Sequence, residues 1–130
     1  MTITQDAGVK SKAFDDLINS FNEIRTLYTI ADSRETFKFI IEQQTITSLI
    51  IEAHDKITAL FPEEKLGLEI KTDPEIPGSR TLWINIYTKI EVDEAFDKLM
   101  ILDDTWWVEA VTSVTNNKLH INLEWESNEI

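Results

Sequence analysis

The segment WWVEAVTSVTNNKLHINLEWES, residues 106–127, decides the predicted fold. Asn116 and Asn117 form a two-residue turn signal, because both residue types tolerate positive φ. Folding the chain about this turn places apolar side chains opposite apolar ones along one face, and a slip of one residue destroys the match. The facing pairs are Val114 with Leu119, Thr112 with Ile121, Ala110 with Leu123, and Val108 with Trp125. The pattern therefore predicts a β-hairpin that starts at Trp106.

Two earlier segments alternate with the same period of two. Residues 66–70 place Leu66, Leu68 and Ile70 on one face, and residues 82–86 repeat the pattern. The loop DPEIPGSR, residues 73–80, separates them. Proline and glycine are typical of turns, so the pattern predicts two antiparallel strands joined by a loop.

Apolar residues recur at helical spacing in three other segments. The spacing predicts helices near 12–30 and over 33–60, the second opened by a capping box at Asp32 and Glu35 and bent near Thr45. A third helix is expected within EVDEAFDKLMILDD, residues 91–104. Residues 1–11 are polar and aperiodic, so a flexible tail is expected there.

The predicted order of elements is α-α-β-β-α-β-β. It indicates an α+β protein, with an N-terminal helical hairpin followed by β-β-α-β-β. The strands would form a four-stranded, mainly antiparallel sheet with helices packed on it. A chain of 130 residues suits one such domain, expected over residues 12–130.

Composition excludes several classes of function. The net charge of −12 and the absence of a basic cluster argue against nucleic-acid binding and against an anionic membrane surface. The chain has no cysteine, so thiol catalysis and thiolate zinc sites are excluded. No apolar segment is long enough to span a bilayer and no signal peptide is recognisable, so a cytoplasmic location is expected. An acidic chain of this kind suits either plain solubility or docking onto a basic partner.

Catalytic motifs are missing from the sequence. There is no phosphate-binding glycine loop and no nucleophile elbow, and the two histidines, His54 and His120, do not lie at ligand spacing. His54 is expected to be an ordinary helix residue. No catalytic residue, metal site or cofactor is predicted.

The second face of the predicted sheet mixes polar and aromatic side chains. Glu109 would lie opposite Glu124, and such a like-charge pair can hold a metal or share a proton. The alternative is a solvated sheet face, which antiparallel sheets commonly have. Alternation gathers on this face Glu69, Lys71, Trp83, Asn85, Tyr87, Trp107, Glu109, Lys118, His120, Asn122 and Glu124. The candidate binding residues among them are Trp83, Tyr87, Trp107, Glu109, His120, Asn122 and Glu124.

The loop at 73–80 is a candidate contact point. Asp73, Glu75 and Arg80 place charges beside prolines, and loops carry function more often than regular elements do. The same residues also fit a simple turn, since Asp before Pro initiates turns and Gly78 permits positive φ.

The segments DPEIPG (73–78), VDEAF (92–96) and DDTWW (103–107) resemble a group of small uncharacterised bacterial proteins. The resemblance implies a bacterial origin and a partner-binding or regulatory role, and it brings no catalytic residues. In DDTWW, the two acids would end a helix and Thr105 would turn into a strand. Alternation would then send Trp106 to the core and leave Trp107 as a candidate contact residue.

These observations favour a non-catalytic binding or regulatory module that acts through a protein partner, as an inhibitor, antitoxin or immunity protein does. A homodimer is also plausible. The alternative is a small-ligand binder or enzyme that uses Glu109, Glu124 and His120 on the mixed sheet face.

Overall fold

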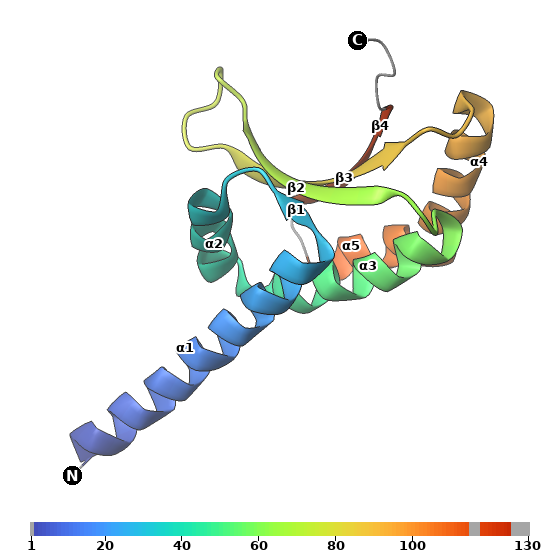
Figure 1. Ribbon diagram of the computed structural model, residues 1–130. Helices are drawn as coiled ribbons and strands as arrows, with labels where there is room; N and C mark the ends of the chain where they lie inside the picture. The colour runs from blue at the N-terminus through green and yellow to red at the C-terminus, as the bar shows by residue number, and fades with distance from the viewer. Residues whose placement is uncertain (1, 115–117, 126–130) are drawn as a thin grey trace.

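The computed structural model describes residues 2–114 and 118–125, with side chains described over 13–111 and 118–125. The elements in chain order are α1 (Thr2–Leu27), β1 (Thr29–Ile30), α2 (Ser33–Glu42), a 3₁₀ turn (Gln44–Ile46), α3 (Thr47–Leu60), β2 (Lys65–Thr72), β3 (Arg80–Thr88), α4 (Val92–Leu102), a π-helical turn (Asp103–Trp107), α5 (Val108–Val114) and β4 (Leu119–Trp125). The strands form one four-stranded sheet (Figure 1). The predicted α+β class is confirmed.

The N-terminal half differs from the predicted helical hairpin. α1 begins earlier than the expected start near residue 12, and the division into a tail over 1–11 and a domain over 12–130 stays a prediction. The strand β1 follows α1 and pairs with β2, so the link between the helices is part of the sheet. The predicted helix 33–60 is wrong as one element, because the 3₁₀ turn at the expected bend near Thr45 divides it into α2 and α3. The capping bond from the Glu35 N–H to Asp32 Oδ1, 3.1 Å long, is present.

The hairpin of β2 and β3 is as predicted. The strands are antiparallel, with Leu66 opposite Ile86 and Leu68 opposite Ile84. These four side chains are buried, at 4% exposure or less, and face the helices. Gly78 has a φ of 79°, the conformation that its place in the loop requires.

The predicted hairpin over 106–127 is wrong. Residues 108–114 are helical, and β4 pairs with β3 in parallel, with Ile84 opposite Ile121. The predicted turn at Asn116 and Asn117 lies outside the described residues. Parallel neighbouring strands need a crossover of a dozen or more residues, and α4, the π-helical turn and α5 supply it.

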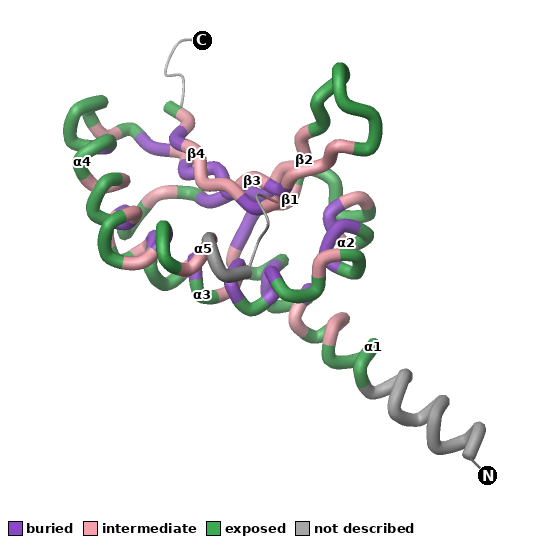
Figure 2. The backbone as a smooth tube through the Cα atoms, turned by 180° about the vertical axis from the view of Figure 1, so that it is seen from behind, coloured by how far each residue is buried: buried purple, intermediate pink, exposed green. Residues whose placement is uncertain are grey.

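The sheet is therefore mixed rather than mainly antiparallel. Its order is β1-β2-β3-β4, parallel between β1 and β2, antiparallel between β2 and β3, and parallel between β3 and β4. Figure 1 shows α1, α3 and α5 on one side of the curved sheet, with the β2–β3 loop and α4 rising at its two ends. Buried positions follow the strands and the inner sides of the helices, as Figure 2 shows. The other side of the sheet has no helix over it among the described residues.

Candidate functional site

The uncovered sheet face carries most of the residues that alternation predicted for it. The pairing aligns them in rows across β2, β3 and β4. One row holds Glu69, Trp83 and His120, the next holds Gly67, Asn85 and Asn122, and the third holds Lys65, Tyr87 and Glu124. The face is thus built by strand register, and neighbouring strands bring together side chains from distant parts of the chain.

Trp83 and His120 form a stacked pair at one end of the face. Their ring centroids are 4.6 Å apart and the ring planes differ by 24°. Lys71 Nζ lies 4.5 Å from the Trp83 ring centroid, and Trp83 Nε1 donates to Thr81 Oγ1 at 2.9 Å. A ring with these neighbours has little rotamer freedom, so Trp83 presents a fixed aromatic surface.

A chain of amides and carboxylates crosses the middle of the face. Asn85 Nδ2 donates to Glu69 Oε1 at 2.9 Å. Asn122 Nδ2 donates to Asn85 Oδ1 at 3.3 Å and to Glu124 Oε1 at 2.9 Å. Asn85 is only 2% exposed, so its amide needs these bonds, which link all three long strands.

Tyr87 lies across Gly67 at the other end of the face. A Cβ at position 67 would lie 2.8 Å from Tyr87 Cε2 and 3.2 Å from the Thr29 carbonyl oxygen. Glycine is therefore required here for close approach of the ring rather than for an unusual φ. The result is a second aromatic surface on the far side of the polar network from Trp83.

A shallow hollow of about 330 Å³ lies beside Trp83 and His120. It is bordered by the start of the 73–80 loop, where Asp73 Oδ1 accepts from the Glu75 N–H at 2.9 Å. Asp73 thus borders the hollow and orders the loop, whereas Glu75 is an exposed loop residue. The lining residues are Lys71, Thr72, Asp73, Ser79, Thr81, Trp83 and His120.

Arg80, the third candidate of the loop, points to α2 instead. Its guanidinium lies 3.8 Å from Glu35 and 3.8 Å from Glu42, and 5.8 Å from the Phe39 ring centroid. Arg80 therefore joins the start of β3 to α2, and its role in the structure is to hold these elements together.

Trp107 and Glu109 do not lie on the face, which corrects the prediction for both. Trp107 is 8% exposed and belongs to the core between helices and sheet, while the half-buried Trp106 donates from Nε1 to Glu52 Oε2 at 3.2 Å. Glu109 lies on α5, so it cannot face Glu124 across a strand pair. The predicted carboxylate pair is wrong, because residues 108–114 are not a strand.

The segment DDTWW is a π-helical turn inside one nearly continuous helical stretch. The Val108 N–H donates to the Asp103 carbonyl, five residues back, so the turn holds one more residue than an α-helical turn. The extra residue turns Trp107 inward. Burial, and then the charge of Asp104, raises the pKa of Asp103 above its ordinary value.

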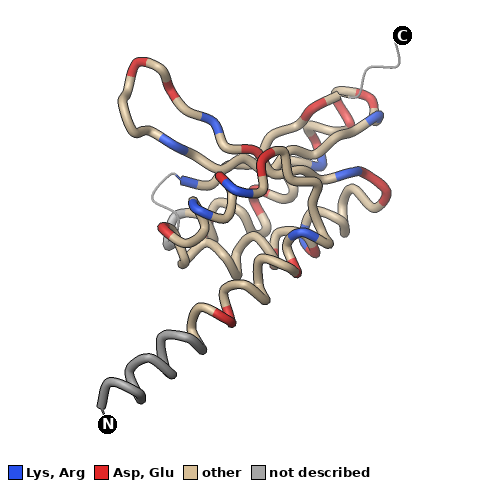
Figure 3. The backbone as a smooth tube through the Cα atoms, turned by 60° about the vertical axis from the view of Figure 1, so that its left-hand side comes forward, with Lys and Arg blue, Asp and Glu red and all other residues tan. Residues whose placement is uncertain are grey.

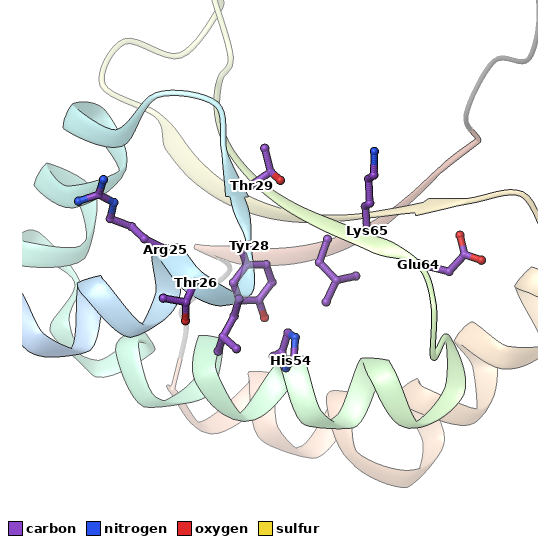
Figure 4. Close-up of a pocket in the computed structure, with 9 residues that line it drawn as sticks. Arg25, Thr26, Tyr28, Thr29, His54, Glu64 and Lys65 are labelled. Atoms are coloured by element: carbon purple, nitrogen blue, oxygen red, sulfur yellow. The ribbon is translucent and has the colours of Figure 1, made fainter.

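Sequence reasoning missed a second hollow, of about 290 Å³, between the end of α1 and α3 (Figure 4). Tyr28 and His54 meet there edge to face at 5.9 Å, and the Tyr28 hydroxyl donates to the Ile50 carbonyl at 2.7 Å. Burial, followed by the charge of Asp55, raises the pKa of Tyr28. Arg25 points away from both rings in Figure 4. The tyrosine is therefore engaged in packing, and the lone histidine at 54 gave no signal for this contact in the sequence.

The described residues contain no group of three or more acidic or histidine side chains placed to hold a metal ion. In the same part of the chain, no helix has the length and apolar content of a membrane span. Comparison of the chain with protein-family models, with curated proteins and with solved structures finds no match.

Proposed function

We propose that this protein is a non-catalytic binding or regulatory module that acts through a protein partner, as an inhibitor or immunity protein does. The observation that carries the proposal is the uncovered sheet face with its fixed aromatic surfaces. Trp83 and Tyr87 are half-buried rings that remain partly exposed on this face, and aromatic side chains are enriched among the residues that dominate binding energy in interfaces. The polar groups between them are already bonded to one another, so little side-chain freedom would be lost on binding.

The concave outline of the sheet supports the same proposal. The backbone of the sheet is curved, with the β2–β3 loop and α4 rising at either end of the uncovered face in Figure 1, and the hollow on this face beside Trp83 and His120 is shallow rather than enclosed. A surface of this shape suits a protein or peptide better than a small substrate, since small-molecule sites usually enclose most of their ligand.

Affinity capture from the native cell, with the intact chain and the variant Trp83→Ala, tests the proposal. We expect the wild type to retain a stoichiometric partner and Trp83→Ala to weaken its binding at least about tenfold, as loss of an aromatic anchor does. Trp106→Ala is the matched control, because Trp106 lies on the helical side. Failure of the wild type to capture a stoichiometric partner, or equal capture by Trp83→Ala, would contradict the proposal.

The hollow beside Trp83 and His120 favours a second candidate, a small-ligand site on the same face. It would use His120, which lines the hollow, whereas Glu124 lies two rows away beside Tyr87 and Glu109 lies on α5. A thermal-shift screen with small metabolites separates the candidates: a ligand that stabilises the wild type and not His120→Ala supports the small-ligand site.

A further inference from the structure

Helix α4 has an apolar surface on the side away from the core. Val92, Phe96 and Met100 follow one another at four-residue intervals, so they form a ridge along one side of the helix. They are 48%, 48% and 60% exposed, whereas Ala95 and Leu102, on the inner side, are 0% and 1% exposed. One apolar side of α4 thus packs against the core, and the ridge of Val92, Phe96 and Met100 is exposed to solvent. Exposed apolar surface of this kind commonly marks an interaction site.

The ridge is backed by an ordered ring from the end of the sheet. Trp125, 38% exposed, packs against Phe96 with ring centroids 5.8 Å apart. Its Nε1 donates to the Ile90 carbonyl at 2.8 Å, just before α4 begins. Phe96, the central residue of the ridge, is therefore supported by a neighbouring ring that is itself hydrogen-bonded to the backbone before α4.

Carboxylates run beside the ridge. Asp93 and Asp97 are one helical turn apart, Asp93 next to Phe96 and Asp97 next to Met100, and both are exposed. The only basic residue from 91 to 109 is Lys98, and its Nζ donates to the Leu60 carbonyl at 3.0 Å, toward the end of α3. The outer surface of α4 is therefore apolar and acidic, and Figure 3 marks acidic positions at this end of the sheet, as it does on the β2–β3 loop.

We propose that the outer surface of α4 docks a basic amphipathic helix of a protein partner. Apolar side chains of that helix would pack on Val92, Phe96 and Met100, and its Lys and Arg side chains would face Asp93 and Asp97. The negative charge of Asp93 and Asp97 favours a basic partner over the other possible occupants. A second copy of the chain would bring the same carboxylates against these, and nucleic acid or an anionic membrane would be repelled. This inference goes beyond the proposed function, because it concerns another surface and does not require the sheet face.

A titration with two synthetic peptides tests the inference. The first is an 18-residue amphipathic helix of Leu and Lys, and the second replaces every Lys with Glu. Fluorescence anisotropy with the intact protein should show binding of the Leu/Lys peptide at least about tenfold tighter than that of the Leu/Glu peptide. Amide chemical-shift changes should centre on α4. Asp93→Lys/Asp97→Lys should weaken binding of the Leu/Lys peptide at least about tenfold, and the milder Asp93→Asn/Asp97→Asn should weaken it less.

The matched control is Asp15→Lys/Asp16→Lys, which changes the net charge equally on an exposed part of α1. An equal loss of binding in this control would overturn the inference, because overall charge alone would then explain the attraction. Concentration-dependent self-association of the wild type that Phe96→Asp abolishes would also overturn it, in favour of a second copy. Trp83→Ala should bind the peptide like the wild type, so failure of the sheet-face proposal and failure of this inference are distinguishable.

Discussion

The substitution Trp107→Ala separates the observed helix from the β-hairpin that the sequence pattern predicts. In the hairpin, Trp106 would be core and Trp107 a surface residue. In the structure Trp107 is 8% exposed and Trp106 is half-buried, so the two interpretations predict opposite orders of destabilisation.

The magnitude follows from burial. A buried tryptophan removes about 150–250 Å² from water, which at ~25 cal/mol per Å² is about 4–6 kcal/mol as an upper estimate. Core Trp→Ala changes lie near the lower part of this range, so we expect a loss of about 4 kcal/mol for Trp107→Ala. Trp106→Ala removes a half-buried ring and a 3.2 Å bond to Glu52, and about 1–2 kcal/mol is expected. The rings are 5.4 Å apart, and both variants lose that contact equally.

Equilibrium urea unfolding followed by far-ultraviolet circular dichroism measures the difference without relying on tryptophan fluorescence. A loss of about 4 kcal/mol is a large part of the ~5–15 kcal/mol that stabilises a domain, so Trp107→Ala could unfold the protein. In that case the test uses Trp107→Phe, which is expected to lose about 1–2 kcal/mol. A destabilisation by Trp106→Ala that equals or exceeds that by Trp107→Ala would refute the helical placement of this pair.

Three further predictions concern the sheet face and the π-helical turn. Gly67→Ala should lower the free energy of unfolding by about 1–2 kcal/mol, because its Cβ would meet the Tyr87 ring at 2.8 Å. Most of this loss should disappear in a Tyr87→Ala background. Additive effects of the two substitutions in a double-mutant cycle would contradict the packing of Tyr87 on Gly67. Asn85→Ala should lower the free energy of unfolding in urea by about 2–3 kcal/mol, since it removes the hydrogen bonds to Glu69 and Asn122 at a site only 2% exposed. A loss below about 0.5 kcal/mol would mean that this hydrogen-bond network is not formed. Burial and the charge of Asp104 raise the pKa of Asp103 above its ordinary 3.8, so its ionised form weakens the folded state at neutral pH and this penalty disappears as the pH falls below that value. Asp103→Asn should therefore raise the melting temperature at pH 7, with a gain that vanishes near pH 3, and a gain independent of pH would point to another cause.

The sequence determined the elements whose periodicity has only one interpretation. Leu66, Leu68 and Ile70 alternate between turn residues, and so do Leu82, Ile84 and Ile86, so both strands and their mutual pairing could be predicted. The same alternation places Trp83, Tyr87, His120, Asn122 and Glu124 on one face, because side-chain direction in a strand depends only on the count of residues. These predictions are local, and local geometry is enough to make them.

Tertiary structure decided the rest. Residues 106–114 are apolar at every second position except Thr112, yet Leu99, Leu102, Trp106 and Ala110 also recur at helical spacing. No glycine or proline after Gly78 marks where a helix ends. In one interpretation residues 106–114 pair with β4, and in the other they cross over the sheet so that β4 pairs with β3. The two differ in long-range contacts, which the local sequence pattern does not encode. The crossover, together with the extra residue of the π-helical turn, buries Trp107 instead of Trp106 and removes Glu109 from the candidate face. The segment DDTWW is therefore a structural turn, because packing of Trp107 on the helix-covered side of the sheet, rather than the local order of its residues, determines its conformation.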